Sequence, residues 1–244
     1  MIIKPATQLA DAIHENIFLL PVLNRFDIQL GFGNKTVEQL CAEKGVNMQF
    51  FLEIVNSFLD KDYFPQSELQ SFPIRLIIDY ISRSHTFYLK YKLPQIEGLI
   101  VKLLENAEPS NKKAYSLIRG FFEEYARELI VHIEKEEDFV HPYILAIDDA
   151  YNKNLVTPEI IMRVKQESIN KYADGHDNVE DKLFDLKNLI IRYLPPAADY
   201  TLSNAILYDL FRLERDLNDH ARIEEKVLVP KVRLLEKRIL AKKA

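Results

Sequence analysis

The sequence predicts an all-α protein, in which a small helical N-terminal domain precedes an antiparallel four-helix bundle. Beyond residue 73, apolar residues recur at spacings of three and four over long stretches, which is the period of an amphipathic helix. No stretch alternates between apolar and polar residues for long enough to indicate a β-strand. The 244 residues include only six glycines and no tryptophan, which is typical of helical proteins. We expect domains at residues 1–70 and 74–242.

Short helices are expected in the N-terminal domain. Thr36 and Gln39 have the spacing of a capping box, and Gly45 should end the helix that they begin. A second helix is expected over residues 48–59, whose apolar side chains recur at helical spacing. Two prolines and several polar residues predict a linker over residues 60–73.

Long amphipathic helices joined by short connections predict the bundle, and we expect them at residues 73–108, 111–140, 157–193 and 201–240. Proline should distort two of them, because it lacks a backbone N–H and clashes with the carbonyl one turn earlier. Pro94 should therefore kink the first helix near Lys90, and Pro230 should kink the fourth helix or end its first portion.

Each expected bundle helix contains one of four histidines, namely His85, His132, His176 and His220. Three of the four have a glutamate four residues later, at Glu136, Glu180 and Glu224. Residues four apart lie one turn apart on one helix face, so each pair can present an imidazole and a carboxylate to a common point. One such pair is ordinarily a solvated contact, but three pairs on three helices favour a buried metal site. Burying so many ionisable groups without a cation would be strongly destabilising.

Two of these segments, residues 132–142 and 220–230, share His, Glu, Glu and Pro at identical offsets, which is typical of a duplicated helical hairpin. His141 follows His132 by nine positions, about half a revolution away on a regular helix, so we interpret it as a surface or packing residue. His14 has no acidic partner at ligand spacing and is not expected to bind metal.

Imidazole and carboxylate ligands in a helical bundle suit iron, manganese or zinc better than calcium or magnesium. Six or seven ligands exceed the four of one tetrahedral zinc ion, so we expect two metal ions with Glu136 and Glu224 as bridging carboxylates. Tyr88, Tyr91 and Tyr172 lie near the histidines in sequence, and either point toward the site or serve in packing, the commoner role.

The His-x-x-x-Glu order is the pattern of hemerythrins, and the chain resembles the iron–sulfur cluster repair di-iron proteins, regulators of cell morphogenesis and nitric-oxide signalling. That family joins a small N-terminal domain to a hemerythrin-like bundle. The resemblance covers essentially the whole chain and rests on residues 26–46, 78–94, 132–142, 176–177 and 219–230.

The resemblance implies a centre of two non-haem iron ions, with manganese or zinc as substitutes. It implies the ligands His85, His132, Glu136, His176, His220 and Glu224. It also implies that dioxygen and nitric oxide bind at the metal site, that damaged iron–sulfur proteins are partners, and that the protein acts under nitrosative or oxidative stress.

The sequence departs from this family at two places. Family members usually carry adjacent cysteines where this chain has Gly31-Phe32, and the single cysteine, Cys41, is expected to be a small buried hydrophobe. A family histidine late in the first bundle helix is replaced by Asn106. We expect Glu180 to fill this vacancy, because it occupies the place of a second histidine on the third helix of hemerythrins.

Two other functions stay open, and one is binding or sensing of oxygen or nitric oxide without repair. The other is DNA binding through residues 36–59, which have the rhythm of a helix–turn–helix. The formal charge of −5 argues against a nucleic-acid partner. No membrane span or signal peptide is recognisable, so we expect a soluble cytoplasmic protein. Catalysis and homodimerisation are left open.

Overall fold

The structure is a computed structural model that describes residues 2–173, 179–195 and 200–242, with the backbone alone described at residues 173 and 179–181. The chain divides into two compact units. The first comprises Met1–Ser84 and Ile223–Lys231, and the second comprises His85–Arg222 and Val232–Ala244. The described residues are mostly helical and contain no β-strand, which confirms the predicted all-α class. The domain limits of 70 and 74 stay a prediction.

The first unit begins with five short helices, α1 (Leu9–Glu15), α2 (Leu19–Arg25), α3 (Val37–Lys44), α4 (Met48–Leu59) and α5 (Gln66–Ser71). The capping box is confirmed, because the Gln39 amide N–H donates to Thr36 Oγ1 and the Thr36 amide N–H donates to Gln39 Oε1. Gly45 ends α3 in the left-handed conformation, as predicted, and α4 has the predicted bounds. The expectation of a plain linker over residues 60–73 is wrong in part, because this segment contains the short helix α5. Burial of Leu69 stabilises that helix.

An aromatic cluster forms the core of this unit. The centroid of the Phe26 ring lies 5.0 Å from that of the Phe51 ring and 5.5 Å from that of the Tyr80 ring. Arg25 Nη1 donates a hydrogen bond of 3.1 Å to the Tyr80 hydroxyl. Tyr80 belongs to α6 (Ile74–Phe87), so the first turns of that helix are anchored in this core.

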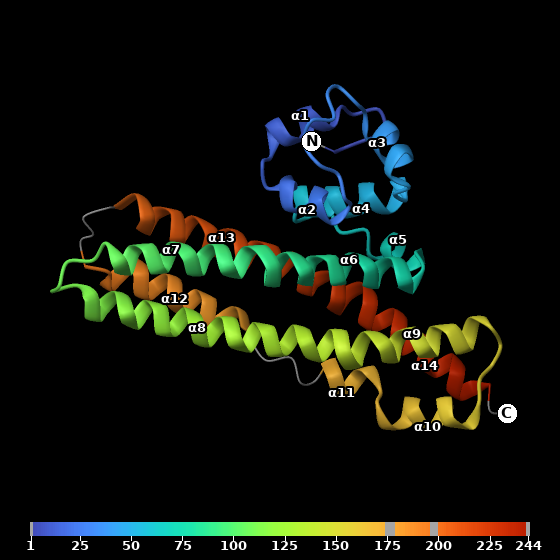
Figure 1. Ribbon diagram of the computed structural model, residues 1–244. Coiled ribbons are helices and arrows are strands. Elements are labelled where there is room, and N and C mark those ends of the chain that lie inside the picture. The colour runs from blue at the N-terminus through green and yellow to red at the C-terminus, as the bar shows by residue number, and fades with distance from the viewer. Residues whose placement is uncertain (1, 174–178, 196–199, 243–244) are drawn as a thin grey trace. The chain divides into compact units, whose positions relative to one another are not determined.

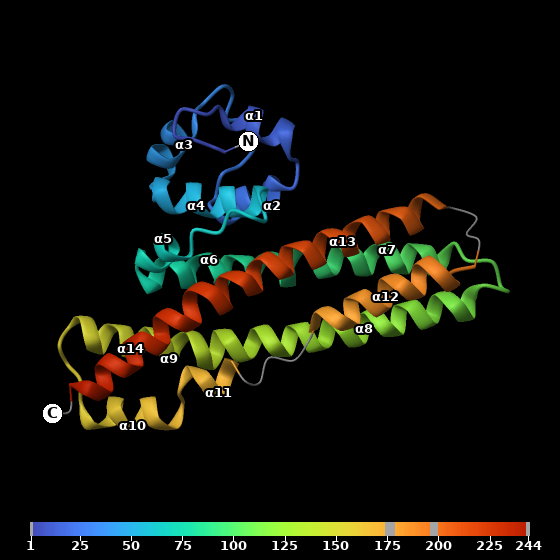
Figure 2. The same ribbon diagram turned by 180° about the vertical axis from the view of Figure 1, so that it is seen from behind.

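The second unit contains the last turn of α6 and most of the bundle, η1 (Tyr88–Lys92), α7 (Leu93–Glu105), α8 (Lys112–Lys135), η2 (Glu136–Val140), α9 (His141–Asn152), α10 (Pro158–Gln166), α11 (Ile169–Ala173), α12 (Val179–Tyr193), α13 (Tyr200–Ile223) and α14 (Val229–Ala241). Helices α7, α8, α12 and α13 run side by side in alternating directions (Figures 1 and 2). Apolar side chains from all four pack into one continuous core. The predicted antiparallel four-helix bundle is confirmed.

Two predicted helix boundaries are wrong. The second bundle helix continues through α9 to Asn152 instead of ending at residue 140. The third is interrupted, because α10 ends at Gln166 and α11 begins at Ile169. The buried Glu236 carboxylate explains the interruption, since it accepts hydrogen bonds from the Ile169 amide N–H at 2.8 Å and from the Ser168 hydroxyl at 2.9 Å. This partner is 67 residues away in sequence, so local periodicity could not reveal it.

Three bundle helices contain a five-residue π-helical turn followed by proline: η1, η2 and η3 (Glu224–Leu228). The distortion predicted near Lys90 occurs as η1, and the one predicted from Pro230 occurs as η3. Each proline stands at the second position of the next α-helix. Because proline offers no N–H to the carbonyl four residues earlier, the helix widens there instead of breaking. Two of the turns, η2 and η3, begin at the predicted ligands Glu136 and Glu224.

Among the described residues, no helix combines the length and the apolar character that crossing a bilayer requires.

Candidate metal centre

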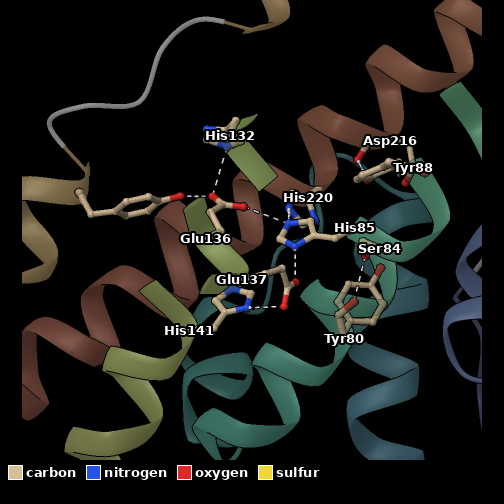
Figure 3. Close-up of polar contacts among 11 residues, drawn as sticks. Tyr80, Ser84, His85, Tyr88, His132, Glu136, Glu137, His141, Asp216 and His220 are labelled. Carbon is tan, nitrogen blue, oxygen red and sulfur yellow. Dashed lines mark hydrogen bonds and ion pairs between the residues drawn. The ribbon is translucent and has the colours of Figure 1, made fainter. Parts of the chain in front are cut away.

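Three predicted ligands from three distant helical segments meet in the second unit. His85 Nε2 lies 3.0 Å from His220 Nε2 and 3.0 Å from Glu136 Oε2 (Figure 3). All three side chains are buried. His85 comes from the end of α6, Glu136 begins η2, and His220 lies in the last turn of α13.

The other oxygen of Glu136 faces a different set of groups. His132, one turn earlier on α8, places Nε2 3.2 Å from Glu136 Oε1, and the Tyr172 hydroxyl donates a hydrogen bond to the same oxygen. Glu136 therefore lies between His132 on one side and His85 on the other (Figure 3).

The glutamate predicted from the second copy of the motif is also buried. Glu224 follows His220 by one turn of the same continuous helix. Within the second unit, one potential ligand atom from each of three residues, His85, Glu136 and His220, lies within 4.8 Å of the others. His176 lies outside the described residues, and so does the side chain of Glu180, so the structure does not test these two predicted ligands.

The spacing of the donors fits a metal ion. An imidazole nitrogen binds a transition metal such as zinc at about 2.1 Å, so two ligands at right angles around one ion are about 3.0 Å apart. That is the separation between His85 Nε2 and both His220 Nε2 and Glu136 Oε2. Glu136 Oε2 is also buried and accepts no hydrogen bond of ordinary geometry from the described residues. A cation would satisfy this oxygen.

The surroundings of Glu136 favour its ionised form. Burial raises the pKa of a carboxyl group, but the imidazoles of His132 and His85 outweigh burial and hold the pKa of Glu136 well below its ordinary value. A carboxylate that stays ionised inside the bundle is a strong ligand for a divalent cation.

A second group of side chains lies on the far side of His85. His85 Nδ1 donates a hydrogen bond of 2.6 Å to Glu137 Oε1, and His141 Nδ1 lies 3.5 Å from Glu137 Oε2. His141 was expected to be a surface or packing residue; it is buried, so the surface alternative is wrong, and it faces Glu137 instead of the opposite side of the helix. The angle assumed a regular α-helix, whereas the π-turn η2 adds one residue to a turn and rotates the next stretch of helix by about 100°. Pro142 was the sequence signal that could have revealed this rotation.

The three tyrosines have three different roles. Tyr172 contacts Glu136, and sequence alone could not distinguish this contact from packing. Tyr88 is fully buried with its ring 5.6 Å from the His220 ring, and its hydroxyl donates to the Asp216 carbonyl. Tyr91 is exposed. Asn106, which replaces the family histidine, is exposed at the end of α7.

The fold and the site together define a helical-bundle protein with a buried His/Glu centre suited to a cation. The family model of the hemerythrin HHE cation-binding domain matches residues 93–232, more than half of the chain. The chain therefore belongs to the hemerythrin HHE cation-binding family and is a metal-binding, hemerythrin-like protein. The matched range includes His132, Glu136 and His220, whereas His85 precedes it. Comparison with curated proteins gives no match.

Proposed function

We propose that the chain is a non-haem di-iron protein whose centre binds dioxygen or nitric oxide. The observation that carries this proposal is the position of Glu136, which has a different imidazole at each carboxylate oxygen. A carboxylate in this position is suited to bridge two cations, each held by the histidine on its own side. Manganese or zinc could occupy the same ligands.

The proposed ligands divide into two sets around Glu136. His85 and His220 would serve one ion, and His132 would serve the other together with His176 and Glu180. In the predicted ligand set, Glu224 is a second bridging carboxylate. The two iron ions would supply an open coordination position and electrons for binding a diatomic molecule. The side chains of His85, Glu136 and His220 are buried, which limits the access of water, and the Tyr172 hydroxyl fixes the Oε1 side of Glu136.

A cavity beside Tyr172 supports the binding of a small molecule. It has a volume of about 300 Å³, and its lining includes Phe139, Tyr143 and Tyr172. Because the Tyr172 hydroxyl contacts Glu136, this cavity leads to a residue in direct contact with the centre.

Stopped-flow absorption spectroscopy of the reduced, iron-loaded protein tests this proposal. The absorption spectrum of the iron centre should change after mixing with dioxygen or nitric oxide, and Glu136→Gln should abolish this change. A protein that carries its iron but shows no spectral response to either gas would contradict diatomic binding.

The resemblance to repair proteins extends the proposal to iron–sulfur cluster repair under nitrosative or oxidative stress, with damaged iron–sulfur proteins as partners. In that role, rapid oxidation or nitrosyl turnover is expected.

One observation favours the alternative of reversible oxygen or nitric-oxide binding without repair. The family's adjacent cysteines are absent, and Cys41 is buried in α3. Burial raises the pKa of its thiol to about 11, which leaves it unsuited to thiol exchange. A stable oxygen adduct that dissociates when oxygen is removed would identify this alternative.

A further inference from the structure

We propose that Glu137 and His141 are positioning residues that hold His85 with its Nδ1 protonated and its Nε2 lone pair directed at the metal centre. This inference rests on the proposed function and concerns residues that the predicted ligand set does not include.

The first step is the contact between His85 and Glu137. A carboxylate only accepts, so the hydrogen bond of 2.6 Å places the proton on His85 Nδ1. In the neutral ring, Nε2 then keeps its lone pair, and Nε2 is the atom that faces His220 and Glu136. Metal-binding histidines characteristically donate their other N–H to a carboxylate, which fixes the ring and strengthens it as a ligand.

The π-turn makes this arrangement possible. Glu136 and Glu137 are consecutive residues of η2, yet they contact opposite edges of one imidazole, Glu136 at Nε2 and Glu137 at Nδ1 (Figure 3). The His85 ring, which is 2% exposed, is thereby clamped between two carboxylates. Glu137 is 36% exposed, so it links the buried ring to the protein surface.

His141 supports Glu137 from the other side. Its Nδ1 lies 3.5 Å from Glu137 Oε2. The His141 and His85 rings are nearly parallel, with an interplanar angle of 7° and a distance of 5.7 Å between their centroids. His141 is also buried, at 4% exposure. The second oxygen of Glu137 therefore has a neighbour that keeps the carboxylate turned toward His85.

The duplicated motif shows that this device is present in one half only. The positions equivalent to Glu137 and His141 in the second copy, 88 residues later, are Glu225 and Val229. Glu225 is exposed, and the side chain of Val229 has no polar atom that could contact a carboxylate. The pair is therefore specific to His85 and is not a general feature of the repeated helix.

The test combines two measurements on the full chain. The first is the ¹⁵N NMR spectrum of the histidines in the metal-free protein, where His85 should carry its proton on Nδ1. The second is anaerobic titration with ferrous iron of the wild type, Glu137→Ala, Glu137→Gln and the matched control Glu225→Ala.

We expect Glu137→Ala to bind iron about 10- to 100-fold more weakly. Glu137→Gln should recover part of the affinity, because its amide oxygen can still accept from Nδ1. His141→Val, which copies the second half of the repeat, should cause a smaller loss, and Glu225→Ala should bind like the wild type.

Wild-type affinity in Glu137→Ala, or a His85 Nδ1 without a proton in the metal-free protein, would overturn the inference. A wild type that binds no iron would instead overturn the proposed function, and the NMR measurement would still report on the His85–Glu137 contact.

Discussion

At the scale of single residues, Glu136 is the side chain on which the proposed two-metal centre depends. Its two oxygens contact His85 and His132 on opposite sides, and its pKa is lowered by these imidazoles against the effect of burial. Glu136→Gln removes the charge and one accepting oxygen, so we expect iron binding to fall from two ions per chain to one or none. Metal analysis after anaerobic loading measures this loss. Glu225→Gln, at an exposed position, is the control and should keep the wild-type content.

Cys41 gives a second prediction at this scale. A thiol with a pKa of about 11 is almost entirely protonated at pH 8, whereas an ordinary cysteine with a pKa of about 8.5 has a substantial thiolate fraction there. Alkylation of the folded protein at pH 8 should therefore be at least tenfold slower than alkylation after unfolding. Mass spectrometry follows the reaction, and equal rates in the two states would show that the thiol is accessible.

The buried residues His85, Glu136 and His220, which we propose as ligands, could be singled out from the sequence because their helical spacing is local and their chemistry is unusual. Tyr172 could not, since its contact with Glu136 depends on how two elements pack, 36 residues apart in sequence. The contact of His141 with Glu137 could not be predicted either, because the direction of His141 depends on a turn that departs from α-helical geometry.

At the scale of elements, the π-turn η2 sets the direction of Glu137 and His141 relative to Glu136. Pro142 is exposed and follows η2, so Pro142→Ala removes little packing and restores a backbone N–H. A regular α-helix could then replace η2, which would rotate His141 relative to Glu136 by about 100°. We expect iron affinity to fall at least tenfold while helix content stays unchanged.

Circular dichroism and iron titration measure these two quantities. Pro158→Ala is the matched control, because Pro158 stands at the first turn of α10, where its missing N–H has no partner in the helix. Loss of iron in this control as well would refute the assigned role of the π-turn.

Element boundaries were predictable where the signal was local. The capping box of α3 and both ends of α4 follow from neighbouring residues. The break between α10 and α11 does not, because a buried carboxylate from α14 competes for the backbone N–H of Ile169.

At the scale of the whole molecule, the bundle class was predictable because the apolar period persists over four long helices, which share one core. The centre joins segments that are far apart in sequence, with His85 135 residues from His220. Bound metal should therefore stabilise the fold, since it binds the folded chain alone. At a thousandfold excess over Kd the gain is about 4 kcal/mol, so chelation should lower Tm by several degrees in differential scanning calorimetry. An unchanged Tm after complete removal of metal would contradict this coupling.

The central claim is that the bundle holds two metal ions bridged at Glu136, and the most direct test is the metal content of the protein after loading with ferrous iron under anaerobic conditions. The account predicts two iron ions per chain in the wild type. One ion or none per folded chain would contradict it.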